Sequence, residues 1–185
     1  MPDGVVEKTP QIEIVPATSA DAQGIQDLMR ASVMATYVKG DVTEDDVADF
    51  YKQEQSPEGL EELTKELAEP GTVVANFVAK DRNMVVGYCR VSKENPDNPS
   101  QNILTRIHVL PSRKGERIGK LLWNHAQSAL DPNKKETVLW VVEDNVPSIE
   151  VYEKHWGFEK TGKRKEKKYK SGAERNEIEM VRRVA

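Results

Sequence analysis

The chain has few of the features that mark secreted, disulfide-bonded or membrane proteins. It contains 185 residues and a single cysteine, Cys89, so it cannot form an internal disulfide, and a disulfide-stapled scaffold is excluded. Its apolar runs, such as residues 138–142, are far shorter than the roughly 20 residues that a helix needs to cross a bilayer. Residues 1–11 carry charged side chains and lack the apolar segment of a signal peptide. We therefore expect a cytoplasmic protein that does not enter a membrane.

Charged residues, by contrast, are abundant and unevenly distributed. They make up 31% of the chain, against 37% for hydrophobic residues, and the formal net charge is −4. Residues 1–70 hold 16 Asp and Glu and 5 Lys and Arg, which gives a net charge of −11. Residues 71–185 hold 15 acidic and 22 basic residues, a net charge of +7. The first stretch is suited to attract cations and the second to attract phosphate, unless both are simply solvated faces.

The spacing of apolar residues predicts a mixed order of helices and strands. Helices are expected at 19–37, at 43–50 (as a short helix or a loop), from Pro57 to a stop before Pro70, and at 119–130 and 147–155. Strands are expected at 12–16, 72–79, 84–91, 103–110, 137–142, 158–163 and 178–181. This order predicts an α/β (α+β) fold of three layers, with helices around a central sheet. Without a repeat or a linker, we expect one domain at 11–185, preceded by a flexible lead-in at 1–10.

The most informative stretch runs from the end of a predicted strand into a predicted helix. Residues 109–122 read Val-Leu-Pro-Ser-Arg-Lys-Gly-Glu-Arg-Ile-Gly-Lys-Leu-Leu, so a glycine-containing turn follows the strand at once. The first N–H groups of a helix have no partner inside it, and with the helix dipole they attract anions. The turn has neither the end of a Walker A loop nor the glycine order of a dinucleotide site. Four cationic side chains make phosphate the natural counter-ion: Arg113, Lys114, Arg117 and Lys120.

This turn resembles motif A of the GNAT superfamily of acetyl-CoA-dependent N-acetyltransferases. In that family a Val-x-Pro strand end leads into a Gln/Arg-x-x-Gly-x-Gly/Ala turn and an apolar helix. Here Lys114 takes the place of the usual Gln or Arg, and Gly115 and Gly119 match two of the glycines. Arg117 replaces the middle glycine, whose role in the family is to bring backbone close to pyrophosphate. Arg117 can still offer its N–H if its backbone is helical, or contact phosphate with its side chain.

A second segment carries the same resemblance. Residues 145–158 are similar to the family pattern Asn-x-x-Ala-x-x-x-Tyr-x-x-x-Gly-Phe, with Asn145 and Tyr152 at the expected spacing. Ser148 replaces the usual alanine, and one extra residue, assigned to Trp156, precedes Gly157 and is expected to distort the end of the helix. With the order of strands, the resemblance covers residues 12–183.

The resemblance implies a fold and a co-substrate. The fold is a GNAT-like three-layer arrangement around a mixed, mostly antiparallel sheet, in which strands four and five are splayed. Acetyl-CoA is then expected to lie in the wedge between these strands, with no metal involved. The residues that the resemblance assigns to its binding are Val109, Leu110, Lys114, Gly115, Glu116, Arg117, Ile118, Gly119, Lys120 and Asn145.

The resemblance also assigns catalytic roles for direct transfer of an acetyl group to an amine. The N–H of Val109 is the candidate donor to the oxyanion, and Tyr152 is the candidate general acid for the leaving thiolate. His108 is the candidate general base, with Glu143, Asp144 and a chain of waters as alternatives. Cys89, in the middle of a strand, is expected to be a buried small hydrophobe rather than a nucleophile. The three tryptophans are expected in the core.

The acceptor is expected to be an amine on a small molecule or a peptide. The acidic first stretch makes a cationic amine one candidate, with Asp41, Asp46 and their neighbours as the attracting groups. An alternative function for the same fold is a catalytically weak acyl-CoA-binding or regulatory module. The basic run at 163–170 is expected to be a solvated hairpin, and nucleic-acid binding is not expected. The oligomeric state is expected to be a monomer or a homodimer.

Overall fold

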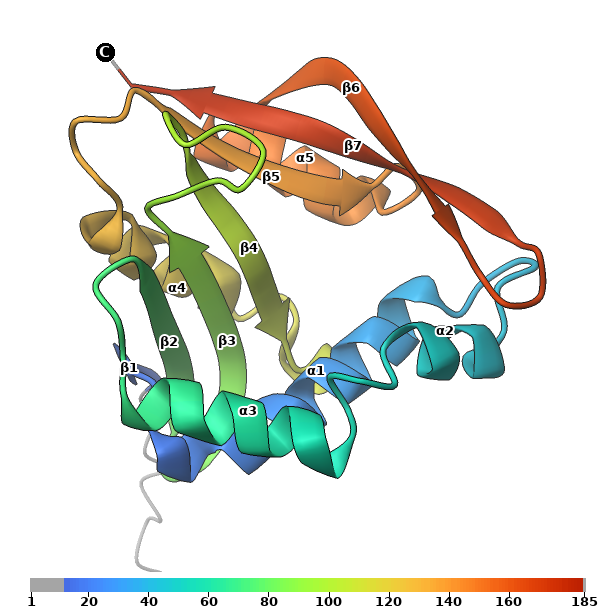
Figure 1. Ribbon diagram of the computed structural model, residues 1–185, viewed down its shortest axis with the longest axis horizontal. Helices are drawn as coiled ribbons and strands as arrows, with labels where there is room; N and C mark the ends of the chain where they lie inside the picture. Colours follow the sequence, from blue (N-terminus) through green and yellow to red (C-terminus); the bar gives the residue numbers. More distant parts are fainter. Residues whose placement is uncertain (1–11, 185) are drawn as a thin grey trace, which may run out of the picture.

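The structure is a computed structural model that describes residues 12–184, so the predicted flexible lead-in lies outside the described residues. Its strands are β1 Ile12–Pro16, β2 Val74–Asp81, β3 Met84–Ser92, β4 Asn102–Val109, β5 Glu136–Val142, β6 Glu159–Lys168 and β7 Glu174–Arg183 (Figure 1). Its α-helices are α1 Ala22–Tyr37, α2 Glu44–Phe50, α3 Pro57–Ala68, α4 Ile118–Ala126 and α5 Val146–Trp156. Short 3-10 turns lie at Ser19–Asp21, Pro111–Arg113 and Gln127–Ala129. No helix among residues 12–184 is long and apolar enough to cross a membrane.

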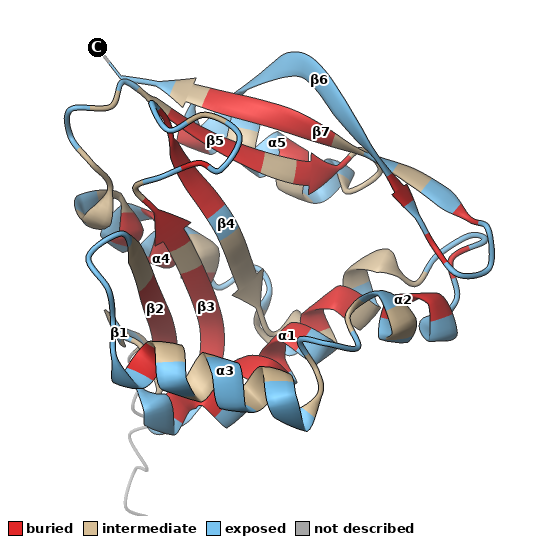
Figure 2. Cartoon of the chain, in the orientation of Figure 1, coloured by how far each residue is buried: buried red, intermediate tan, exposed pale blue. Residues whose placement is uncertain are grey.

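All seven strands belong to one mixed sheet in the order β1-β2-β3-β4-β5-β7-β6. Every neighbouring pair is antiparallel except β4 and β5, which are parallel. Helices α1 and α3 pack on one face, against Val78, Val85 and Tyr88, and helices α4 and α5 contribute to the larger core on the other face. Figure 2 shows the buried strands of the centre between these helix layers. The predicted three-layer fold with helices around a central sheet is confirmed.

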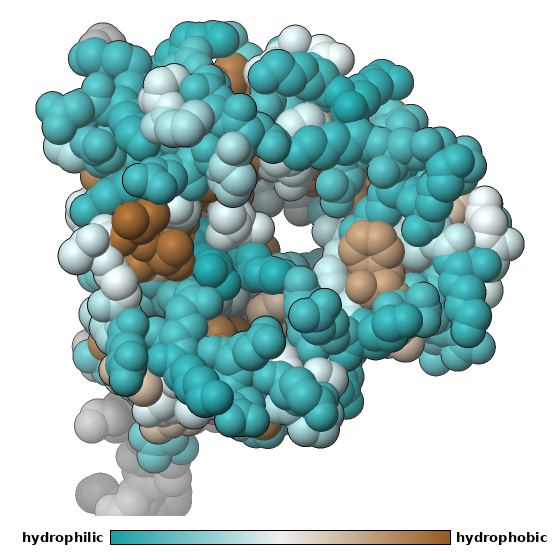
Figure 3. Space-filling view, viewed as in Figure 1, coloured by the Kyte–Doolittle hydropathy of each residue, from teal (hydrophilic) through white to brown (hydrophobic). Residues whose placement is uncertain are grey.

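The two parallel strands touch only where they begin. Asn102 pairs with Thr137 and Ile103 with Val138, and no further pair follows. A bulge in the pairing of β4 with β3 inserts Thr105 just beyond this point, and such a bulge bends and twists a strand. Strand β5 meanwhile stays paired with β7 along its whole length. The predicted splay of strands four and five is therefore present, and the space-filling view shows an opening at the centre of the molecule (Figure 3).

The turn of the β6–β7 hairpin closes the far side of this opening by docking on α1 and α2 (Figure 1). The N–H of Ser171 donates to Oδ1 of Asp46 over 2.8 Å, and Tyr169 and Ala173 join a small core with Val33 and Val47. Asp46 also completes a capping box with Thr43 at the start of α2. A single carboxylate thus ties the start of a short helix to a turn 125 residues away in the chain.

Some predicted details differ from the structure. Leu121 in the apolar run of α4 is 42% exposed, because the helix turns its Leu122 and Trp123 face to the sheet. The helix ends at Ala126, where a 3-10 turn replaces the predicted continuation to residue 130. Strand β6 extends well past residue 163, since an edge strand can expose charged side chains on both faces.

Candidate functional site

The end of β4 presents an unsatisfied N–H group to the opening. The N–H of Leu110 donates to the carbonyl of Val86 on β3 over 3.0 Å. Because successive N–H groups of a strand point to opposite sides, the N–H of Val109 points away from β3. On that side β5 has already departed, so no neighbouring strand accepts this bond. The N–H of Val109 is therefore left without a strand partner on the side where β4 and β5 part.

The turn that follows offers a row of further donors. Among the described residues, no acceptor is bonded to the N–H groups of residues 115–120. Gly115 has φ +91°, and Arg117, the N-cap of α4, has φ +63° and ψ 14°. Arg117 therefore adopts the left-handed conformation that glycine favours, not the ordinary helical one that the sequence left open. Although Arg117 has a side chain, its backbone takes a conformation that is typical of glycine.

The charged side chains of the turn divide into two groups. Arg113 is bound internally: its Nε lies 2.7 Å from Glu116 and its Nη1 2.9 Å from Asp81. These bonds lower the pKa of the Glu116 carboxyl and raise that of Arg113, so both are structural charges. Lys114, Arg117 and Lys120 are exposed and have no ion pair among residues 12–184. Three of the four predicted cations therefore stay available for a phosphate ligand.

Two other predicted cofactor-binding residues contribute less than expected. Leu110 uses its N–H on Val86 and its carbonyl on the N–H of Arg113, so only its side chain remains for a ligand. The side chain of Ile118 is 1% exposed, and only its backbone faces the turn. The absence of a side chain at Gly87 allows α4 to pack closely on β3. A Cβ on Gly87 would lie 2.8 Å from Ile118 and Leu122, whereas one on Gly119 would meet only Val109, at 3.9 Å.

Tyr152 lies on α5, packed against Trp156 and Phe158 at ring-centroid distances of 5.2 and 6.1 Å. Burial raises the pKa of Tyr152, with a further rise from the charge of Tyr37 and an opposing effect of the Ser148 hydroxyl. Its hydroxyl is therefore protonated at neutral pH, as a proton donor must be. The extra residue before Gly157 widens the last turn of the helix, where the N–H of Gly157 bonds the Tyr152 carbonyl five residues back. The expected distortion is present.

Asn145 is the N-cap of α5, but its side chain does not cap the helix. Its N–H donates to the carbonyl of Val142 over 2.9 Å, and its carbonyl accepts from Ser148 and Ile149. Its amide side chain has no bond to any described residue. Asn145 follows the end of β5 by three residues, so it joins the strand that parts from β4 to the start of α5.

His108 lies on the face of β4 that meets α1. Its Nδ1 is 3.0 Å from Oγ of Ser32. Burial lowers the pKa of His108 to about 4, helped by the positive charges of Arg106 and Lys114. The ring is therefore neutral at pH 7 but only weakly basic, which argues against it as the main proton acceptor.

The other candidates for proton transfer or nucleophilic attack have different roles in the structure. Glu143 pairs with Arg164 over 2.7 Å, and Asp144 pairs with both Lys39 and Arg175. Cys89 is fully buried, and burial raises the pKa of its thiol. It is a core residue, as expected.

Comparison with known proteins agrees with this geometry. The profile of the acetyltransferase (GNAT) family matches residues 40–158, which include the turn, the parted strands and Tyr152. The chain belongs to the GNAT acetyltransferase family. A search of curated proteins gives no significant match.

Solved GNAT structures share the whole fold at low identity. The PaiA N-acetyltransferase from Thermoplasma acidophilum, solved with coenzyme A, matches with TM-score 0.71 and 19% identity over 94% of this chain and 99% of that one. A probable acetyltransferase from Staphylococcus epidermidis matches with TM-score 0.69 and 18% identity over 95% and 100%. The ribosomal-protein-alanine N-acetyltransferase from Brucella melitensis matches with TM-score 0.65 and 19% identity over 93% and 99%. These likenesses establish the GNAT fold.

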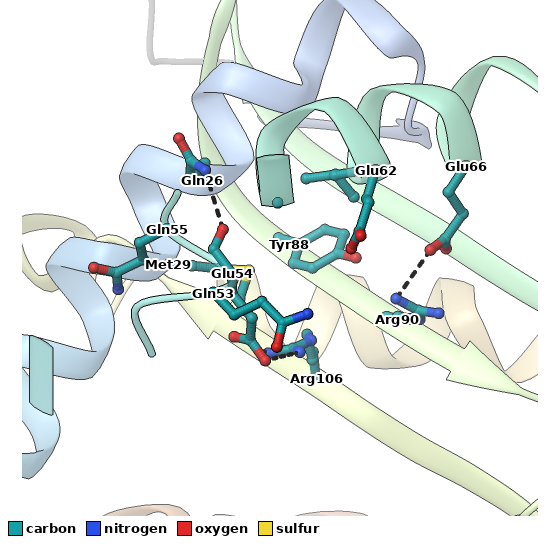
Figure 4. A pocket seen from close by; sticks show the side chains of 12 residues that line it. Gln26, Met29, Gln53, Glu54, Gln55, Glu62, Glu66, Tyr88, Arg90 and Arg106 are labelled. Carbon is teal, nitrogen blue, oxygen red and sulfur yellow. Dashed lines mark hydrogen bonds and ion pairs between the residues drawn. The ribbon is translucent and has the colours of Figure 1, made fainter. Parts of the chain in front are cut away.

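Sequence reasoning missed a pocket that adjoins His108 on the α1 face. It has a volume of about 300 Å³ and is lined by side chains from α1, α3, β3, β4 and the segment 53–55 that precedes α3 (Figure 4). Arg106 forms two hydrogen bonds to Glu54, and Arg90 pairs with Glu66 at its wall. No motif marks these residues, because they come from four elements. The one sequence signal for it is the alternation of β4, which puts Arg106 on the same face as His108.

The acidic residues expected to attract an acceptor do not form a shared site. Asp41 pairs with Arg175 and Asp49 with Lys52, while Asp46 bonds Thr43 and Ser171. The basic run at 163–170 is similarly paired, with Glu179, Glu143, Asp97, Glu177 and Glu174 as its partners. The run is exposed as expected of a solvated hairpin except at Lys167 and Tyr169, which are buried where the hairpin docks on α1 and α2. The charge asymmetry of the sequence is thus largely neutralised within the fold.

Proposed function

We propose that the protein is an N-acetyltransferase that moves an acetyl group from acetyl-CoA to a primary amine. The observation that carries this proposal is the set of unused backbone donors at Val109, where β4 and β5 part, and at residues 115–120 in the turn that follows. The free N–H groups and the three unpaired cations of the turn suit a pyrophosphate. The polar backbone in the wedge suits the amide-containing arm of the coenzyme. The co-substrate therefore fits the residues present.

The reaction is a direct attack of the amine on the thioester carbonyl through a tetrahedral intermediate. The amine nitrogen forms a bond to the carbonyl carbon, the carbon–sulfur bond breaks, and the thiolate leaves. The N–H of Val109 stabilises the oxyanion, and a donor in such a position contributes about 3 kcal/mol. Tyr152 gives its proton to the thiolate, since its raised pKa keeps it protonated until that step, and it is reprotonated through solvent by the proton that the nitrogen loses as the amide forms.

The acceptor must lose a proton before it attacks. An alkylamine has a pKa near ~10.4 and is mostly protonated at neutral pH. With a pKa of about 4, His108 does not hold that proton well. We assign its removal to solvent in the central opening and give the His108–Ser32 pair the role of lining the acceptor side.

The test is a screen of primary amines with acetyl-CoA, with detection of the free thiol. We expect thiol release that depends on the amine and an acetylated product of 1:1 stoichiometry. The competing proposal is a module that binds coenzyme A without turnover, which the strained Arg117 in the phosphate turn favours. Strong thermal stabilisation by acetyl-CoA without thiol release on any amine would support the module and contradict the enzyme.

A variant at the turn tests where the coenzyme is held. Gly119→Glu should abolish coenzyme A binding, because the side chain fills the phosphate site and adds like charge. The new Cβ meets only Val109 at 3.9 Å, so the melting temperature without ligand should be unchanged. Gly87→Glu is not a suitable control, since its Cβ would clash inside the fold. Unchanged coenzyme affinity in folded Gly119→Glu would show that the pyrophosphate is bound elsewhere.

A further inference from the structure

Lys167 is the only buried residue of the ten in β6, and its ammonium group is enclosed by aromatic rings. Its side chain is 5% exposed. Its Nζ lies 3.9 Å from the ring centroid of Phe50 and 5.0, 5.1 and 5.9 Å from those of three tyrosines. It donates to the Tyr51 hydroxyl over 3.1 Å and pairs with Glu177 over 3.5 Å. We call this group the ammonium cage: Tyr37, Phe50, Tyr51, Tyr169 and Glu177.

The lining of the cage is specific for a cation. Aromatic faces attract ammonium groups, and phenol and carboxylate oxygens accept their hydrogen bonds. The rings of the cage lie close together: the centroids of Tyr37 and Tyr51 are 6.2 Å apart, and that of Phe50 is 5.6 Å from that of Tyr169. The hydroxyl of Tyr169 is buried and has no hydrogen-bond partner among the described residues. Lys167 therefore leaves one polar group of the cage unused.

Packing of the hairpin alone does not explain this arrangement. A hydrophobic residue at position 167 would dock the hairpin on α1 and α2 without the cost of burying a charge. That cost is visible in Lys167, whose pKa is lowered by burial despite Glu177. Phe50 is 46% exposed, so one wall of the cage faces solvent and offers a way in.

The cage and the His108–Ser32 pair are both built on α1. Tyr37 is the last residue of this helix. Ser32, the partner of His108, precedes Tyr37 by five residues, which is roughly 7.5 Å along a helix axis. An acceptor that extends from the end of β4 along α1 therefore leads toward the cage.

We propose that the ammonium cage binds the second cationic group of a diamine or polyamine acceptor, and that Lys167 occupies it until such an acceptor displaces it. This inference rests on the proposed function, because it names the acceptor of that reaction. A tethered lysine competes at a high effective concentration, so it weakens the apparent affinity for the acceptor. Its removal should strengthen that affinity.

The experiment compares 1,4-diaminobutane with butylamine as acceptors of wild type, Lys167→Met and Lys168→Met. Lys168 is the matched control, because its neighbouring side chain is exposed and lies outside the cage. Lys167→Met should lower the KM of the diamine by about fivefold or more and leave that of butylamine unchanged. Lys168→Met should behave like wild type. Tetramethylammonium, followed by calorimetry without acetyl-CoA, should bind Lys167→Met more tightly than wild type.

A second variant keeps Lys167 in place, since its loss can loosen the hairpin. Tyr169→Phe removes only the unpartnered hydroxyl, so the melting temperature should hold while the KM of the diamine alone rises. Equal ratios of diamine to butylamine KM in wild type, Lys167→Met and Tyr169→Phe would overturn the proposal. So would equal tetramethylammonium binding by wild type and a folded Lys167→Met. If no amine is acetylated but tetramethylammonium binds Lys167→Met more tightly, the cage stands and the proposed reaction fails.

Discussion

The clearest test at the scale of a single residue is the hydroxyl of Tyr152. Tyr152→Phe keeps the ring that packs on Trp156 and Phe158, so the melting temperature and the KM of acetyl-CoA should change little. The maximal rate should fall by about 100-fold, a typical loss when a general acid is removed. Thiol-release kinetics at saturating acceptor measure this directly. An unchanged maximal rate would assign the leaving-group proton to another donor.

His108 makes a prediction about acid stability. Its pKa is lowered to about 4 in the folded protein against about 6.5 for the free side chain, so below pH 6.5 the unfolded chain takes up the proton more readily. Stability present above pH 6.5 is therefore lost as the pH falls through 4, by up to about 3 kcal/mol. Urea unfolding of wild type and His108→Gln at pH 7 and pH 4 should show a smaller loss in the variant. Equal losses of stability in wild type and variant would mean that folding does not lower the pKa of His108.

At this scale, sequence reasoning located positions better than it located roles. Asn145, Tyr152 and Val109 were found because a motif fixes their spacing along the chain. The position of a residue in a motif does not show whether its charge is paired with another residue in the folded protein. The pairing of Arg113 with Asp81 joins residues 32 apart, and Lys167 reaches Tyr51 across 116 residues. Such pairs depend on strand register and hairpin docking, which no local pattern encodes.

At the scale of an element, the phosphate turn holds a residue in an unfavourable backbone conformation. Arg117 has φ +63°, which is costly for a residue with a Cβ. Arg117→Gly should therefore raise the free energy of unfolding by about 1 kcal/mol, measured by urea titration. Gly115→Ala is the matched reverse change, because φ +91° is again left-handed and no atom lies within 4 Å of the added Cβ. Gly115→Ala should lower the free energy of unfolding. If Arg117→Gly also lowered it, the arginine side chain would be shown to stabilise the turn.

Most elements were predictable, because their ends carry strong local signals. The start of α3 is marked by Ser56 and Pro57, and the start of α2 by the capping box of Thr43 and Asp46. The central strand β5 is marked by the apolar run at 137–142. The lengths of α4 and β6 were not predictable in the same way. A 3-10 turn ends α4 at Ala126 without a glycine, and β6 is nearly all charged, so no hydrophobic alternation marks its extent.

At the scale of the whole molecule, the opening is a ring whose parts come from distant segments. Strands β4 and β5 form one side, and the α1–α2 segment and the β6–β7 turn form the other (Figures 1 and 3). The mixed sheet and its splay followed from the family resemblance. The closure did not, because it depends on bonds such as Ser171 to Asp46 between surfaces that meet only after folding.

This closure makes Asp46 a link between two segments that are remote in sequence. Asp46→Ala removes the capping box of α2 and the acceptor of the Ser171 N–H at once. Hydrogen exchange at 44–50 and at 169–173 should therefore accelerate together, by about tenfold, whereas β2 and β3 stay protected. The bonds of Asp46 hold its carboxyl pKa at about 2, so the same effect should appear in wild type only when the pH approaches that value.

Asp21→Ala provides the matched control for this prediction. Asp21 forms the same capping box with Thr18 before α1 and an ion pair with Lys80, but it has no bond to the hairpin among residues 12–184. It should accelerate exchange near the start of α1 and leave 169–173 unchanged. Exchange that rises in α2 alone in Asp46→Ala would show that the hairpin is held by the ammonium cage and Arg175 without this carboxylate. In that case the contact of Lys167 with α1 and α2 would hold the β6–β7 turn in place. Lys167 is also the group that the proposed acceptor displaces.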